Sequence, residues 1–137
     1  MNDPCSLQYI KSSYVSVFMK SISERLIEYS MSVINLCSRK GGNYSELHIK
    51  KQLVRSATSS GANYQESFFA ESRKDWIHKI KISLKELNES LYWLKLLYSM
   101  PGYMAVNALI DENEQLIKIL SKSVITAEKK LAKPTNS

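Results

Sequence analysis

Apolar residues recur along four stretches of the chain at intervals of three and four, the spacing that places them on one face of an α-helix. The first face begins at Leu26 and ends at Cys37, and the second runs from Lys50 to Phe68. The third face consists of Trp76, Ile80, Leu84, Leu87, Leu91, Leu94 and Tyr98. The fourth consists of Leu109, Asn113, Leu116, Leu120, Val124 and Ala127. The pattern predicts four amphipathic helices.

Local signals place the ends of these helices. Ser21, Asn43 and Ser72 each precede an acidic residue by three positions, which is the form of a capping box at a helix start. Gly41-Gly42 ends the first helix, and Pro101-Gly102 ends the third.

The short segments between the helices determine how they pack, because consecutive helices joined by short loops lie side by side and antiparallel. With a fourth helix over residues 105–131, we expect an all-α, antiparallel up-down-up-down four-helix bundle at residues 20–131. Residues 1–19 are expected to form an N-terminal arm, extended or helical, and residues 132–137 a polar tail. Only 4 Gly and 3 Pro argue against an all-β sandwich, which needs many turns.

The middle of the second helix, residues 56–62, consists of small residues with poor helix propensity. If this segment is helical, tertiary packing holds it, and its small side chains let a neighbouring helix approach closely. A loop is the alternative interpretation.

The third helix carries a second apolar patch away from its main face, formed by Ile82, Trp93, Leu96 and Leu97. A helix of a bundle needs only one buried face, and an exposed apolar patch marks an interface. We therefore expect an oligomer contact at this patch. The alternative is that the N-terminal arm folds back and covers it.

The chain is basic, with 19 Lys and Arg against 13 Asp and Glu and a formal net charge of +6. Lys74, Lys81 and Lys85 fall near one side of the third helix, with Lys95 and Tyr92 close by. Cations beside an aromatic residue suit phosphate contacts and base stacking. Glu86 and Glu89 are expected on another flank, and an ordinary solvated helix face is the alternative interpretation.

Signals for catalysis are weak. His48 and His78 lie far apart, and no metal-binding or phosphate-loop motif is present, so we expect no enzymatic activity, no metal and no cofactor. Cys37 lies on an apolar face, which favours a buried, inert thiol. Arg55 and Glu66 are expected to form structural ion pairs with other helices rather than a catalytic pair.

The sequence also bears on location. Two cysteines are not a disulfide framework, so reduced thiols and a cytoplasmic location are expected. No stretch approaches the roughly 20 apolar residues of a membrane span, and the start of the chain lacks the features of a signal peptide.

Several segments together resemble a known family. They are residues 52–63 (QLVRSATSSGAN), Glu66, residues 72–77 (SRKDWI), Lys79, residues 84–94 (LKELNESLYWL) and Gly102-Tyr103. The chain resembles the bacterial four-helix-bundle family named for open reading frames inside 23S rRNA intervening sequences. The resemblance implies a cytoplasmic homopentameric ring without known enzymatic activity, and such a ring would account for the second apolar patch. A related branch serves diversity-generating retroelements as an accessory subunit that binds the reverse transcriptase and nucleic acid.

These observations lead to one main functional hypothesis, a non-catalytic oligomeric bundle that binds RNA or DNA through phosphates. The candidate contact residues are Lys50, Lys51, Arg55, Arg73, Lys74, Lys81, Lys85 and Lys95. The alternative is a protein–protein adaptor, for example for a reverse transcriptase. No membrane partner is expected.

Overall fold

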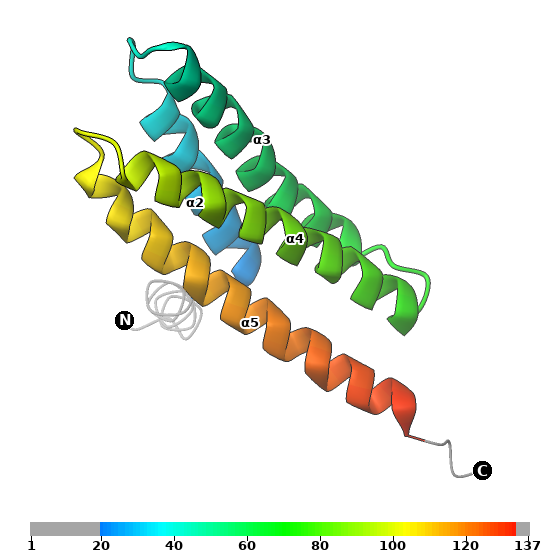
Figure 1. Cartoon of the computed structure of the whole chain (residues 1–137). Coiled ribbons are helices and arrows are strands. Elements are labelled where there is room, and N and C mark those ends of the chain that lie inside the picture. Colours follow the sequence, from blue (N-terminus) through cyan, green and yellow to red (C-terminus); the bar gives the residue numbers. More distant parts are fainter. Residues whose placement is uncertain (1–19, 134–137) are drawn as a thin grey trace, which may run out of the picture.

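A computed structural model describes residues 20–133, and this part of the chain contains four long helices and no strand. They are α2 (Ile22–Cys37), α3 (Tyr44–Ser67), α4 (Arg73–Tyr98) and α5 (Asn107–Ala132), with a short 3₁₀ helix, η1 (Met104–Val106), directly before α5 (Figure 1). The all-α prediction is confirmed for the described residues. The predicted arm at residues 1–19 lies outside them, as does the tail from residue 134 onward.

The helix starts lie where the capping signals predicted them. Ser21 accepts a hydrogen bond from the Glu24 backbone N–H, and the Glu24 carboxylate accepts one from the Ser21 N–H at 2.8 Å, which completes a capping box. Asn43 and Ser72 also cap their helices through the side chain. At Asn43 only half of a capping box forms, because the carboxylate of Glu46 has other partners and accepts no hydrogen bond from the Asn43 N–H.

The helices pack around one hydrophobic core, to which all four contribute fully buried residues such as Leu26, Leu53, Leu87 and Leu116. α4 packs against α3 and α5, and α2 packs against the same two helices. α2 has 16 residues, whereas α3 has 24 and α4 and α5 have 26 each. At 1.5 Å per residue α2 is about 12–15 Å shorter than its neighbours. One end of the helix group therefore has three helices instead of four (Figure 1).

The closest packing joins α3 to α4 through pairs of buried serines. The Ser83 hydroxyl donates to the backbone carbonyl of Ser60 at 2.7 Å, and the Ser90 hydroxyl donates to the Ser56 hydroxyl at 2.8 Å. All four serines are fully buried. Residues 56–62 are helical, so the loop interpretation is wrong and the predicted close approach is correct.

The same segment also contacts α2. A Cβ atom added at Gly61 would lie 3.7 Å from the Cβ of Leu26, and the Ser30 hydroxyl donates to the Ala57 carbonyl at 3.2 Å. Small residues thus admit a neighbouring helix on two sides of α3.

The predicted apolar face of the third helix needs one correction. Tyr98 is 45% exposed, and Leu97, which the sequence placed on the exposed patch, is completely buried. The buried positions of α4 are Ile77, Ile80, Ser83, Leu87, Ser90, Leu94 and Leu97. Serines occupy two of these positions. A face defined by the apolar residues alone therefore departs from the buried face and ends at exposed Tyr98.

A charged cluster ties two loops together at the four-helix end. Lys50 is only 4% exposed; its ammonium group lies 2.9 Å from the Glu46 carboxylate and donates to the Arg39 carbonyl at 3.4 Å. The Tyr103 hydroxyl donates to Glu46, and Tyr103 and Glu46 both raise the pKa of Lys50. The prediction that Lys50 contacts phosphate is therefore corrected: its side chain is buried and its charge is compensated.

The serine pairs generate a stability prediction. Ser60→Leu should destabilise the protein by about 1–3 kcal/mol or more, because the larger side chain forces α3 and α4 apart. Ser60→Ala, the matched control, should change stability by less than about 1 kcal/mol, since the Ser60 hydroxyl bonds only within its own helix, to Ala57. Urea unfolding followed by circular dichroism measures both. Equal stabilities of the two variants would contradict the close approach.

The charged cluster generates a pH prediction. Hydrogen bonding to Tyr103, and then to Lys50, holds the pKa of Glu46 below its ordinary value of 4.5. Its contribution to stability is therefore present above pH 4.5 and is lost as the pH falls below it. Tyr103→Phe should reduce the loss of stability between pH 7 and pH 3, measured by urea unfolding at both pH values. Tyr98→Phe, at an exposed tyrosine, should leave that loss unchanged, and an unchanged loss in Tyr103→Phe would refute the assignment.

Candidate nucleic-acid interface

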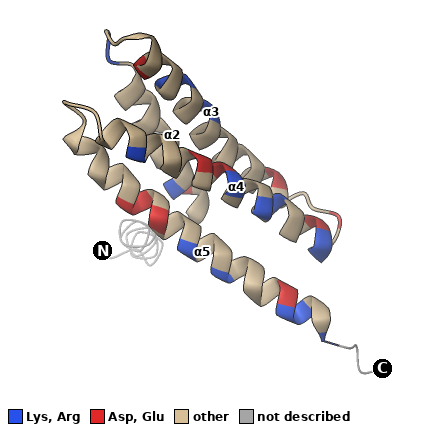
Figure 2. Ribbon diagram, viewed as in Figure 1, with Lys and Arg blue, Asp and Glu red and all other residues tan. Residues whose placement is uncertain are grey.

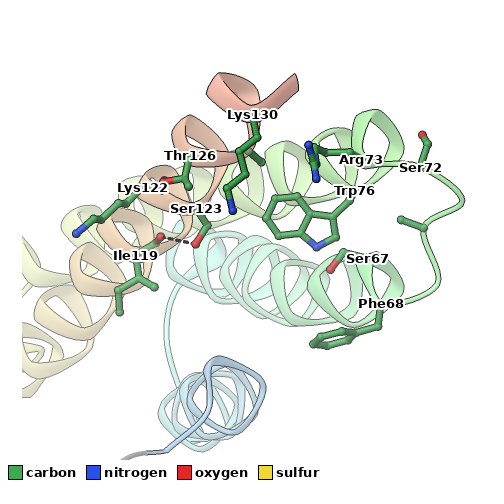
Figure 3. Close-up of a pocket in the computed structure, with 12 residues that line it drawn as sticks. Ser67, Phe68, Ser72, Arg73, Trp76, Ile119, Lys122, Ser123, Thr126 and Lys130 are labelled. Carbon is green, nitrogen blue, oxygen red and sulfur yellow. Dashed lines mark hydrogen bonds between the residues drawn. The ribbon is translucent and has the colours of Figure 1, made fainter. Parts of the chain in front are cut away.

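A groove of about 810 Å³ opens at the three-helix end. It lies between the end of α3, the start of α4 and the second half of α5 (Figure 3). The first turns of α2 lie beside residues 58–65 of α3, so α2 stops short of the groove, which begins at Ser67 and Phe68. The missing turns of the fourth helix thus leave this space open.

The rim of the groove is basic. Arg73 from α4 and Lys122 and Lys130 from α5 line it, and no acidic residue is among the lining residues. Within residues 20–133 none of these three cations has a carboxylate at ion-pair distance. Figure 2 shows Lys and Arg at the start of α4 and along the second half of α5, at the same end of the molecule. The groove therefore combines uncompensated positive charge with a concave surface.

The wall and floor of the groove are largely apolar. Trp76, half-buried against the core, lies in the groove with its indole between Lys130 and Ser67, and Arg73 lies beside it (Figure 3). Ile119 and Ala127 of α5 contribute further apolar surface. This set of groups, a flat aromatic ring surrounded by cations, suits a planar ligand that carries negative charge.

The predicted basic side of the third helix divides into two kinds of lysine. Lys81 pairs with Glu128 at 2.6 Å and Lys95 with Glu114 at 3.9 Å, so both link α4 to α5. Lys74 and Lys85, together with Lys51 of α3, are exposed and have no ion-pair partner among the described residues.

Arg55 and Glu66 form the predicted structural ion pairs. The Arg55 guanidinium lies 3.3 Å from Glu86 and also pairs with Glu89, and Glu66 lies 2.9 Å from Lys79. Glu86 and Glu89 face α3, where they compensate Arg55. Arg55 is consequently a weak candidate for phosphate contact, because a phosphate would have to displace two carboxylates.

The predicted oligomer patch is partly buried within this chain. Leu97 belongs to the core, Leu96 and Trp93 pack against it, and Ile82 is half-buried. The Trp93 indole N–H donates to Glu89 at 3.2 Å, and its ring meets that of Tyr92 edge to face, with centroids 4.9 Å apart.

Two of the three groove cations, Lys122 and Lys130, were not among the predicted contacts. Lys122, Thr126 and Lys130 follow one another at intervals of four, so they share a face, and this spacing was the available signal.

Groups suited to catalysis are sparse in the described part. Residues 20–133 contain no group of three His, Cys, Asp or Glu side chains that would hold a metal ion. Burial raises the pKa of the Cys37 thiol to about 11, so the thiol is protonated at neutral pH. Within the same residues no helix has the length and apolar character needed to span a membrane.

Comparisons with known proteins give a consistent result. A family model described as 23S rRNA-intervening sequence protein matches residues 20–122. The crystal structure of a protein with unknown function from the S23 ribosomal protein family of Bacteroides thetaiotaomicron VPI-5482 is similar, with 30% identity and a TM-score of 0.64 over 76% of this chain and 98% of that one. Among curated proteins no match is found. The chain belongs to the 23S rRNA-intervening sequence protein family.

Proposed function

We propose that the protein binds RNA or DNA through phosphate contacts at the basic groove and acts without catalysis. The observation that carries this proposal is the convergence of Arg73, Lys122 and Lys130 on a groove without acidic lining residues. Exposed Lys74 lies at the start of the same helix as Arg73 and extends the basic surface. The formal net charge of +6 supports a polyanionic partner.

The family supports RNA among the polyanions. Its description refers to the intervening sequence of 23S rRNA, and the similar crystal structure comes from a family described as ribosomal. A partner of this kind is consistent with the cytoplasmic location expected from the sequence.

The proposed functional unit is an antiparallel up-down-up-down bundle assembled as a homopentamer. Short connections between consecutive helices, and the contacts of each helix with the next, support the antiparallel order. Tyr92, 57% exposed beside Trp93, provides apolar surface for self-association on the patch that also includes Ile82 and Leu96.

A second candidate function is an adaptor for a protein partner such as a reverse transcriptase. It is favoured by Phe68 and Phe69, which are 58% and 85% exposed at the turn between α3 and α4. Association with such a partner would survive nuclease treatment, whereas association through nucleic acid would not.

Salt dependence tests the main proposal. The logarithm of the affinity for a labelled RNA, measured by fluorescence anisotropy, should fall linearly with the logarithm of the salt concentration. Replacing two groove cations in the double variant Arg73→Gln/Lys130→Gln should make the slope shallower by about 1.5. Lys40→Gln with Arg39→Gln, the same charge change at the opposite end, should alter it much less. Equal effects of the two double variants, or no binding at low salt, would contradict the proposal.

Sedimentation velocity tests the assembly. Tyr92→Glu should lower the sedimenting mass, because the variant places a charge in an apolar contact. Tyr98→Glu makes the same change elsewhere on α4 and should leave the mass unchanged. Since both side chains are exposed, both variants should fold, and circular dichroism verifies this. An unchanged assembly in Tyr92→Glu would place the self-association elsewhere.

A further inference from the structure

We propose that the groove receives an unpaired base of a single-stranded nucleic acid, stacked on Trp76, while Arg73, Lys122 and Lys130 hold the neighbouring phosphates; this inference rests on the proposed function and assigns the form of its ligand. The groove has a volume of about 810 Å³, within the range of roughly 300–1,000 Å³ of sites that enclose small ligands.

The position of Trp76 selects for an unpaired base. Its indole lies inside the groove and is half-buried against the core, below the cations of the rim (Figure 3). In a duplex each base is stacked on its neighbours and is not free to enter. A single strand exposes its bases, and stacking on an aromatic side chain is a common way in which proteins hold them. The cations alone, in contrast, serve single strands and duplexes alike.

The hydroxyl groups around the ring favour weak discrimination between bases. Ser67, Ser123 and Thr126 all donate to backbone carbonyls of their own helices, at 2.6, 3.1 and 2.9 Å. Their hydrogens are engaged, so these hydroxyls are not free to donate to the edge of a base. Stacking accepts any base, because every base has a π face. We therefore expect binding that depends on strandedness more than on sequence.

The groove also extends beyond the part of the chain that the family model matches. That match ends at residue 122, whereas Ser123, Thr126, Ala127 and Lys130 all line the groove. These four residues lie on the last turns of α5, so the wall facing Trp76 is built largely by a segment outside the family match.

Tryptophan fluorescence of the full chain tests the inference. The chain has only two tryptophans, so Trp93→Phe leaves Trp76 as the sole indole reporter. Oligothymidylate should quench its emission at low salt, and a duplex of equal length should bind with little quenching. Before nucleic acid is added, acrylamide should quench Trp76 readily, as an open groove requires.

Two substitutions separate stacking from charge. Trp76→Leu should weaken single-strand binding about tenfold, which is within the range measured for loss of one stacked base, and should change duplex affinity less than twofold. Thr126→Glu places a carboxylate at an exposed position of the groove and should weaken single-strand binding and quenching, whereas Thr126→Gln, of the same size, should not. The Thr126 pair keeps the test decisive if Trp76→Leu does not fold.

The outcomes distinguish this inference from the function on which it rests. Salt-dependent binding with unchanged Trp76 emission, or equal loss of single-strand and duplex affinity in Trp76→Leu, overturns the base pocket and leaves phosphate binding intact. Poor acrylamide quenching of the free protein means that another part of the chain or a second copy fills the groove, which also overturns the pocket. Absence of any binding at low salt overturns both.

Discussion

The close approach of α3 and α4 is the constraint on which the remaining structure depends. Ser83 bonds to Ser60 and Ser90 to Ser56, and these two contacts fix the helices in one register without bulky side chains between them. Because the register is fixed, the start of α4 lies next to the end of α3, and the turn between them is short. α5 then packs on α4 and extends past the point at which α2 begins. The groove is the space that this arrangement leaves.

The parts of the fold that local chemistry determines were predictable. Ser21, Asn43 and Ser72 cap their helices as expected, since a cap involves only residues within one turn. The burial of Leu97 was not predicted, because the seam of α4 contains two serines that apolar spacing cannot detect. Their burial depends on the partner helix, where serines lie at the matching positions.

The candidate site was predictable only in part, for a similar reason. The sequence shows which residues are charged, and two of the predicted contact residues, Arg73 and Lys74, are exposed. It does not show which carboxylates lie opposite on another helix. Arg55 and Lys81 are compensated across helices, whereas Lys122 and Lys130 have no ion-pair partner within residues 20–133. Free charge is a property of the tertiary arrangement, so the strongest basic surface appeared only when α4 and α5 were placed together.

The cluster of Glu46, Lys50 and Tyr103 makes the two ends of the molecule different. It joins the loop after α2 to the loop before α5 at one end, through contacts between residues more than fifty positions apart. At the opposite end the ion pairs Glu66–Lys79 and Lys81–Glu128 are more exposed to solvent, and the helices there have one neighbour fewer. Local opening, which begins where buried contacts are fewest, should therefore start at the last turns of α5 and reach the linked end last. Amide protons should exchange with solvent in that order, and the groove would be the most adaptable part of an otherwise rigid scaffold.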